Sequence, residues 1–274
     1  MRQKPLKFAI SSAIALVWAA LCTMLAVPWA RASSIQLPSG YVLWVIVGIA
    51  LLPGDLMCAM FFSNLFNAKM HAIATPCREP VSVLICARNE QNCIFQTIRQ
   101  VVQQDYDGRI DLLCVDNASS DGTRTEIQRA IRVLSSRRRS IRLLICNTPG
   151  KAYALNAGLA EIQTRYFITV DADTLLDKKA ICKIMRRITS SGAGCVAGNL
   201  LVKDAASLTQ KMQIYDYLIS IAAVKRFQGS YASTLVAQGA FSAYETQAVR
   251  DAGGWRQCAR ADLYALATGP QFAI

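Results

Sequence analysis

Two aspartates, one residue apart, directly follow an apolar run of the chain. Asp171 and Asp173 come after Tyr166 to Val170, a stretch typical of a buried strand. Two carboxylates at such a point are costly unless a cation neutralises them, and Mn²⁺ or Mg²⁺ binds carboxylate oxygens together with phosphates. We therefore expect Asp173 to bind a divalent metal ion that holds a diphosphate, and Asp171 to assist the metal or hold a ribose. A helix-capping turn is the structural alternative.

A further acidic residue, Asp116, ends another apolar run and precedes a polar stretch that includes Ser120 and Asp121. Serine or aspartate before a helix is an ordinary N-cap, which accounts for Ser120 or Asp121. It does not account for Asp116, which ends a strand. A carboxylate there can accept the N3–H of a uracil base, so Asp116 is a candidate nucleobase ligand.

Gly150 and Lys151 follow a third apolar run and open a predicted helix. The free backbone N–H groups at a helix start favour an anion, and Lys151 adds a cation. The pair therefore predicts a diphosphate contact. A lysine that simply lies on the surface is the alternative.

The elements that must position these residues alternate between short apolar runs and amphipathic stretches. We expect strands over 81–86, 111–115, 141–146 and 166–170, and helices over 90–103, 121–134, 151–163 and 177–189. Such alternation predicts a parallel sheet, whose strands all place their carboxyl ends at one edge. The motif residues fall at those ends, which is a stronger indication than any single motif.

Two more elements are expected after this alternation. A strand is predicted over 194–202, and a helix over 205–226 with apolar residues at helical spacing. This helix either packs on the sheet or lies at a membrane surface.

The first quarter of the chain is rich in apolar residues. Segments 8–28 and 41–65 are each long enough to cross about 30 Å of hydrocarbon, and basic residues precede the first. A cleaved signal peptide is the rival explanation for the first segment, but its apolar stretch is too long. Asp55 interrupts the second, so it faces a helix partner or water, or else the helix ends near Leu52.

These segments define the expected organisation. Residues 1–66 form a membrane region with two transmembrane helices, 67–80 a linker, and 81–274 a catalytic domain. The basic amino terminus favours a cytoplasmic location for both ends of the helix pair. We therefore expect a multi-pass protein of the inner (cell) membrane, in contact with membrane lipid, whose catalytic domain is cytoplasmic.

Charge and cysteine content exclude other classes. The net charge is +12, but the basic residues are dispersed and the one run, Arg137 to Arg139, fits a solvated helix end, so nucleic acid is not an expected partner. The 10 cysteines include no C-x-x-C pair and accompany a single histidine, which argues against zinc and favours reduced thiols.

Taken together, these segments resemble the GT-A domain of family 2 glycosyltransferases, closest to the membrane-bound processive β-type that includes poly-N-acetylglucosamine, chitin, hyaluronan and cellulose synthases. The matching segments are 86–90, 116–123, 150–158, 170–174 and 253–255. The resemblance implies an α/β GT-A fold, a UDP-sugar donor, Mn²⁺ or Mg²⁺, a glycan acceptor and inversion at the anomeric carbon. It also implies that Ala87 and Glu90 help to hold the uridine, and it favours UDP-N-acetylglucosamine.

The carboxyl-terminal part departs from the family pattern. Asp262 falls where the family has its general base, but Ala261 replaces the acidic neighbour, and an exposed helix residue is the alternative for Asp262. The family's acceptor-site motif and later helices do not follow, so a carboxyl-terminally truncated enzyme is expected. Two alternatives remain: an inactive fragment that binds UDP-sugar or partners a full-length synthase, and a nucleotidyltransferase, which normally has a glycine-rich loop that 86–90 lacks.

Overall fold

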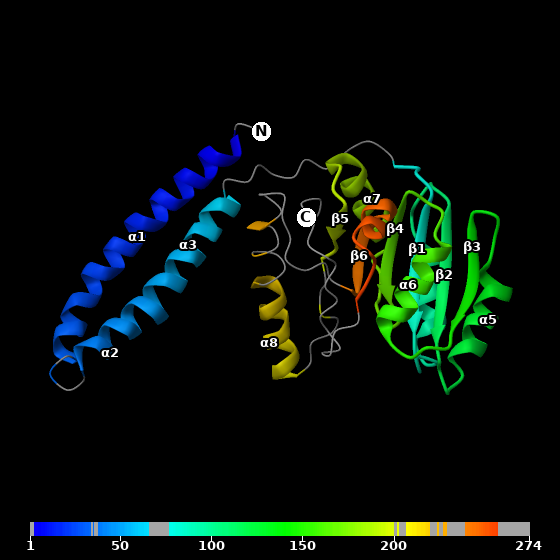
Figure 1. Ribbon diagram of the computed structural model, residues 1–274, viewed down its shortest axis with the longest axis horizontal. Coiled ribbons are helices and arrows are strands. Elements are labelled where there is room, and N and C mark those ends of the chain that lie inside the picture. Colours follow the sequence, from blue (N-terminus) through cyan, green and yellow to red (C-terminus); the bar gives the residue numbers. More distant parts are fainter. Residues whose placement is uncertain are drawn as a thin grey trace. The chain divides into compact units, whose positions relative to one another are not determined.

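A computed structural model gives the fold of the chain (Figure 1). The structure describes residues 3–33, 35, 38–65, 77–199, 202, 207–219, 224, 227–228 and 239–256. By contacts between Cα atoms, the chain divides into two compact units. One consists of residues 1–71 and 204–231, and the other of residues 72–203 and 232–274.

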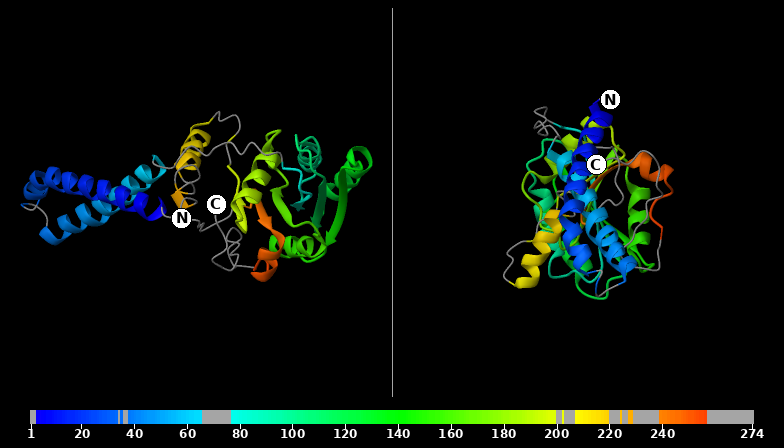
Figure 2. Two further views of the ribbon diagram at one scale, coloured as in Figure 1. Left: turned by 90° about the horizontal axis from the view of Figure 1, so that it is seen from above. Right: turned by 90° about the vertical axis from the view of Figure 1, so that its left-hand side faces the viewer.

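The amino-terminal unit contains a pair of long apolar helices. Helix α1 (Gln3–Ser33) packs against α3 (Leu52–Leu65), which continues α2 (Ser39–Trp44) and the π-helical turn η1 (Val45–Leu51), as Figures 1 and 2 show. Two stretches of 26 residues, Phe8–Ser33 and Gly40–Leu65, have mean hydropathies of 2.2 and 2.1. By length and composition, both are able to cross a membrane.

The second helix does not end near Leu52. It continues through Pro53 to Leu65, directly after the π-helical turn. Proline lacks an N–H group, so a local change of hydrogen-bond register before it preserves the helix. Asp55 therefore lies inside the helix, and its Oδ1 atom is buried with no hydrogen-bond partner in the described part of the chain.

Helix α8 (Leu208–Tyr217) is the described core of the helix expected over 205–226. Ser207 and Gln210 form a reciprocal capping box at its start, with their side chains and backbone N–H groups paired in both directions. Large apolar side chains, Leu208 and Met212 among them, are exposed on this helix.

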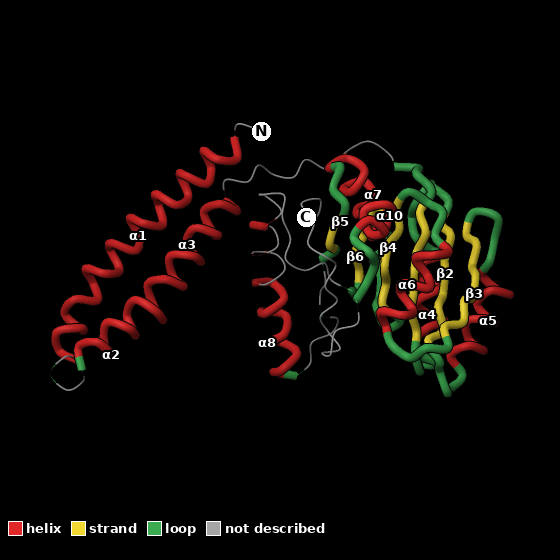
Figure 3. The backbone as a smooth tube through the Cα atoms, in the orientation of Figure 1, coloured by secondary structure: helices red, strands yellow, loops and turns green. Residues whose placement is uncertain are grey.

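The second unit is built on a six-stranded sheet (Figure 3). Its strands are β1 (Val81–Ala87), β2 (Ile110–Asn117), β3 (Arg139–Cys146), β4 (Tyr166–Asp171), β5 (Cys195–Ala197) and β6 (Phe241–Glu245), in the order β3-β2-β1-β4-β6-β5. The first four are parallel, and β6 is antiparallel to both β4 and β5. The predicted mostly parallel α/β sheet is confirmed.

In the described part of this unit, five helices flank the sheet in two layers. They are α4 (Ile94–Val102), α5 (Thr123–Leu134), α6 (Lys151–Glu161), α7 (Ala180–Ser191) and α10 (Thr246–Asp251). Alternate residues of a strand face opposite sides, so Val83 belongs to the core that includes residues of α4, α5 and α7, while its neighbour Leu84 belongs to the core that includes residues of α6 and α10. This alternation makes a core on each side, which a strand buried on both faces requires.

The end of the domain differs from the sequence-based expectation. Strand β5 is limited to Cys195–Ala197, and neither β6 nor α10 was predicted. The short β6 comes late in the chain and inserts between β4 and β5. Its place depends on pairing with residues far away in sequence, which a local pattern does not reveal.

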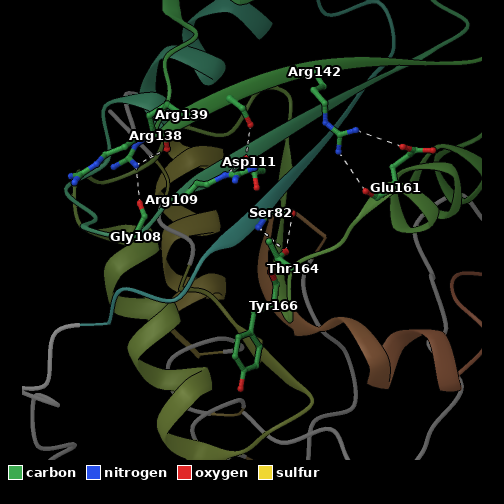
Figure 4. Close-up of polar contacts among 11 residues, drawn as sticks. Ser82, Gly108, Arg109, Asp111, Arg138, Arg139, Arg142, Glu161, Thr164 and Tyr166 are labelled. Carbon is green, nitrogen blue, oxygen red and sulfur yellow. Dashed lines mark hydrogen bonds and ion pairs between the residues drawn. The ribbon is translucent and has the colours of Figure 1, made fainter.

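The basic run at 137–139 agrees with the expected solvated face only in part, because Arg137 and Arg138 are exposed whereas Arg139 is half-buried. Helix α5 ends at Leu134, and Arg139 opens β3. Its guanidinium donates to the carbonyl oxygen of Gly108 at 2.8 Å (Figure 4) and to that of Tyr106 at 2.5 Å. Burial lowers the pKa of Arg139, whose hydrogen bonds connect the start of β3 to the loop before β2.

Candidate functional site

The carboxyl ends of the parallel strands meet at one edge of the sheet, as predicted. In the register, Ala87 pairs with Asp116 across β1 and β2, and Cys86 pairs with Asp171 across β1 and β4. Three predicted site residues, Ala87, Asp116 and Asp171, thus end adjacent strands. Ligands of open α/β sheets bind at this edge.

The loop after β1 is hydrogen-bonded to the loop after β2. Asn89 has a positive φ of 58°, its N–H donates to Ser119 Oγ at 3.1 Å, and its Oδ1 accepts from Ser120 N at 2.9 Å. Asparagine tolerates this left-handed conformation better than most residues. The backbone N–H of Glu90 donates to Thr123 Oγ1 at 2.7 Å. The two loops therefore form one rigid unit, which sequence analysis did not foresee.

The Asp121 carboxylate accepts hydrogen bonds from backbone N–H groups near the start of α5. Its Oδ1 accepts from the N–H of Thr123 at 3.0 Å, and its Oδ2 accepts from the N–H of Gln91 at 3.2 Å. The cap position itself is Gly122, but the carboxylate performs the capping role predicted for Ser120 or Asp121. Burial raises the pKa of Asp121, yet these hydrogen bonds outweigh burial and hold the pKa below its ordinary value.

Ala87 and Glu90 are both predicted to hold uridine, but they differ in the chemical groups that they contribute. Ala87 is buried as a whole residue and contributes its backbone at the end of β1. The half-buried Glu90 carboxylate accepts from Cys93 Sγ at 3.0 Å. Burial and then the hydrogen bond to Glu90 raise the pKa of Cys93 to about 12, so this thiol stays a neutral donor.

Asp116 has no exposed side-chain surface. Its Oδ2 accepts from Arg124 Nε at 2.9 Å and forms an ion pair with Arg124 Nη2 at 2.8 Å, and its Oδ1 accepts from Ser119 N at 3.3 Å. A buried carboxylate is costly without a partner, and the guanidinium supplies one. The Arg124 side chain is 43 % exposed. Sequence reasoning missed Arg124, although an arginine in the first turn of the next helix was the available signal.

Asn117 fixes the loop that leads into α6. Its Nδ2 donates to the carbonyl oxygen of Thr148 at 2.7 Å, and its Oδ1 accepts from Gly150 N at 2.8 Å. Gly150 has a φ of 135°, which side chains rarely permit. This hydrogen-bonded turn determines where Lys151 begins the helix.

Lys151 and Asp171 are brought together as an ion pair. Lys151 Nζ lies 2.5 Å from Asp171 Oδ1, and the two side chains are 31 % and 28 % exposed. The backbone N–H of Asp171 donates to the carbonyl oxygen of Ala240 at 3.1 Å, which ties the end of β4 to the residue before β6. A cation and a carboxylate therefore stand together, partly open to solvent, at the end of β4.

Asp173 differs from the other motif carboxylates because it is exposed, and no described residue hydrogen-bonds its side chain. The described residues contain no group of three or more potential metal ligands. Mg²⁺ and similar ions are often held by one or two carboxylates together with substrate phosphates, not by an all-protein cage. Asp171 and Asp173 fit this mode, with Asp173 as the open ligand.

The Gly-Gly-Trp segment is anchored on α6. Asn156 Nδ2 donates to the carbonyl oxygen of Trp255 at 2.8 Å, and Asn156 Oδ1 accepts from Trp255 N at 2.9 Å. The buried indole makes edge contacts with Phe167 and Tyr244. Gly254, with a φ of 72°, lies so close to Asn156 that a Cβ would meet its Oδ1 at 2.5 Å. The predicted base, Asp262, lies outside the described residues.

With this geometry in place, comparisons with known proteins define the class. Residues 82–253, more than half of the chain, match glycosyl transferase family 2. The chain belongs to this family, whose members are glycosyltransferases, and its GT-A fold agrees with that assignment.

The chain is similar to poly-β-1,6-N-acetyl-D-glucosamine synthases of Staphylococcus aureus (26 % identity) and Staphylococcus epidermidis (25 %). Each match extends over 178 residues, which is 65 % of this chain and 42 % of the relative. The chain thus matches less than half the length of these curated relatives.

Among solved structures, the fold is similar to that of the mannosyltransferase PcManGT from Pyrobaculum calidifontis, in complex with GDP-Man and Mn²⁺. The TM-score is 0.57 at 22 % identity, over 76 % of this chain and 59 % of that chain.

Proposed function

We propose that this protein transfers a sugar, N-acetylglucosamine, from a UDP-sugar donor to a glycan acceptor, with inversion at the anomeric carbon. One observation carries the proposal: the Lys151–Asp171 ion pair stands beside the open carboxylate of Asp173 at the carboxyl edge of a family 2 domain. The donor sugar rests on the similarity to poly-N-acetylglucosamine synthases.

Lys151, Asp171 and Asp173 form the diphosphate part of the proposed site. Lys151 Nζ already lies against one carboxylate, and its partial exposure leaves it accessible to a phosphate oxygen. Asp173, with Asp171, would hold Mn²⁺ or Mg²⁺. A bound metal ion would neutralise the departing diphosphate.

The connected loops after β1 and β2 form the uridine part. Asp116 and the backbone of Ala87 and Glu90 would belong to the nucleoside part of the site, and the hydrogen bonds between Asn89 and the two serines, Ser119 and Ser120, keep the loops in place before the donor arrives. A preorganised loop lowers the entropy cost of binding.

Asp262 is the proposed general base. Its carboxylate accepts the proton of an acceptor hydroxyl as that oxygen attacks the anomeric carbon on the face opposite UDP. The bond from the anomeric carbon to the UDP oxygen breaks, and UDP leaves with the bonding electrons. The anchored Trp255 supports this role because its hydrogen bonds hold the chain shortly before Asp262 against α6, the helix that begins at Lys151.

Membrane attachment is part of the same proposal. We expect α1 and the α2–α3 helix to span the inner (cell) membrane, with residues 81–274 on the cytoplasmic side and 67–80 as linker. Their apolar side chains, such as Leu16 and Leu25 at 65 % and 71 % exposed, support burial in lipid.

UDP release tests the transferase proposal. The detergent-solubilised chain is incubated with UDP-N-acetylglucosamine, Mn²⁺ and a chitooligosaccharide acceptor, alongside Asp262→Asn and the control Asp107→Asn. Asp107 is exposed and lies before β2, at the opposite end of the strands. Release by the wild type and the control, lost in Asp262→Asn, is expected.

Two other outcomes would contradict parts of the proposal. Undiminished release by Asp262→Asn would remove Asp262 from the base role. Donor binding without any release by the wild type would indicate a non-catalytic protein that binds UDP-sugar.

A further inference from the structure

Asp116 and Arg124 differ sharply in exposure, although they form one ion pair. The Asp116 side chain is 0 % exposed, and the Arg124 side chain is 43 % exposed. A nucleobase that approaches this edge of the sheet therefore contacts the Arg124 guanidinium before the Asp116 carboxylate. The expectation that Asp116 binds a uracil N3–H directly rests on the strand end alone, whereas the structure places Arg124 against this carboxylate.

The geometry of the pair leaves part of the guanidinium available. Nε donates to Asp116 Oδ2 at 2.9 Å, and Nη2 lies 2.8 Å from the same oxygen. No hydrogen bond from Nη1 to any described residue is found. A guanidinium that is held at one edge is fixed in its plane, so the rest of its N–H groups present a defined donor surface.

We infer that Arg124 is the nucleobase contact of the donor site, and that Asp116 is a positioning residue that acts through Arg124. This inference rests on the proposed function, because it names the base-reading group of that same site. The guanidinium would donate to the O4 carbonyl oxygen of uracil. Cytosine carries an amino group at this position, which is itself a donor and leaves the arginine unpaired.

The neighbouring contacts support this assignment. Arg124 lies in the first turn of α5, and Thr123 before it is bound to Glu90 N. Ser119, in the loop that Asn89 secures, donates to the other oxygen of Asp116. The carboxylate is thus held from two sides, so the arginine that it pairs with is confined as well.

The test compares two ligands that share a diphosphate and a ring size. Binding of UDP and of CDP is measured by calorimetry with Mn²⁺, using the full chain in detergent. We expect the wild type to prefer UDP. In Arg124→Met, UDP affinity should fall roughly tenfold to a hundredfold, as for the loss of a charge-assisted hydrogen bond, while CDP affinity changes little. The UDP/CDP ratio should therefore approach one.

A matched control and a conservative variant separate recognition from stability. Arg129→Met removes an arginine from the same helix, one that pairs with Glu126 at 3.2 Å, and should leave the UDP/CDP ratio unchanged. Arg124→Lys keeps the charge without the planar fork and should restore part of the preference. A merely structural role of Arg124 would change the thermal midpoint but not this ratio.

A double variant tests whether Asp116 acts through Arg124. Asp116→Asn alone should reduce the UDP preference, but Asp116→Asn in the Arg124→Met background should reduce it no further. This double variant also removes the buried charge that could unfold Arg124→Met. A further loss of UDP preference in the double variant would mean that Asp116 contacts the base itself, and would overturn the inference.

The failures of the two proposals are distinguishable. If the wild type binds neither UDP nor UDP-N-acetylglucosamine, the proposed function fails and the inference fails with it. If the wild type prefers UDP over CDP and Arg124→Met keeps the wild-type ratio, the inference alone fails.

Discussion

The two edges of one sheet carry similar polar residues but use them differently. At the amino edge, Ser82 N donates to Thr164 Oγ1 at 3.1 Å, and Asp111 Oδ1 accepts from Arg109 Nε at 2.8 Å and from Ser140 Oγ (Figure 4). Arg139 completes this edge through backbone carbonyls. These polar groups satisfy one another.

The carboxyl edge has one part whose polar groups hydrogen-bond one another and a second part whose charged groups are exposed to solvent. The loops after β1, β2 and β3 are tied together through Asn89 and Asn117. Beyond them, the Lys151–Asp171 pair is partly exposed, and Asp173 is open among the described residues. Polar groups that complete each other indicate a structural role, whereas charged groups held in place but left accessible indicate a binding site. Charge content alone would not distinguish the two edges.

The largest expected effect is at Asp173. Asp173→Ala should reduce Mn²⁺-dependent UDP binding on the order of 100-fold or more, because even loss of an outer-shell partner of a metal ligand costs about 10–100-fold. Stability should change by less than about 0.5 kcal/mol, since the side chain is exposed. Calorimetry with and without Mn²⁺ measures the first effect, and urea unfolding the second. Undiminished metal-dependent binding of UDP would contradict the assignment of Asp173 to a binding site at the carboxyl edge.

The opposite response is expected at the amino edge. Arg139→Met leaves the carbonyl oxygens of Tyr106 and Gly108 without their donor and should lower the free energy of unfolding by about 1–3 kcal/mol. Donor affinity at 25 °C should be that of the wild type. Urea unfolding and UDP calorimetry on the same preparation measure both. A selective loss of UDP affinity would show that this edge is not purely structural.

Gly254 tests the link between the site and the segment that follows it. Gly254→Ala places a side chain at a φ of 72° and against Asn156, which should cost about 1–2 kcal/mol of stability. Because the displaced Trp255 precedes Asp262, turnover should fall while UDP binding remains. Equal losses of binding and turnover would contradict this separation. Ala252→Gly, at the residue before Gly253 and Gly254, is the control.

The smallest effect concerns Cys93, in the part of the carboxyl edge whose polar groups hydrogen-bond one another. Its pKa is raised from an ordinary 9.0 to about 12, by burial and then by Glu90. A raised thiol pKa stabilises the fold below the unfolded pKa, and this stabilisation is lost as the pH rises from about 9 to about 12. We expect slow alkylation of Cys93 by iodoacetamide at pH 8 in the native protein and fast alkylation in urea. Mass spectrometry of the peptides measures both rates, and equally fast native labelling would contradict the burial.

The sequence by itself determined the α/β class and the strand ends that carry Asp116, Lys151, Asp171 and Asp173. Hydrophobic periodicity is a local property, so it located β1 to β4 within a few residues and placed the motifs after them. The same local signal could not show that β6 inserts beside β4, because that pairing joins segments about 70 residues apart, as Val170 and Phe241 are.

Only the tertiary structure decided how the site residues are paired. It placed Arg124 over Asp116, Lys151 against Asp171, and Asn156 against Trp255, 99 residues away. It also left Asp173 exposed while it buried Asp116 completely. Burial and hydrogen-bond partners depend on the packing of neighbouring strands and loops, so two aspartates near the carboxyl ends of strands differ in exposure and in partners.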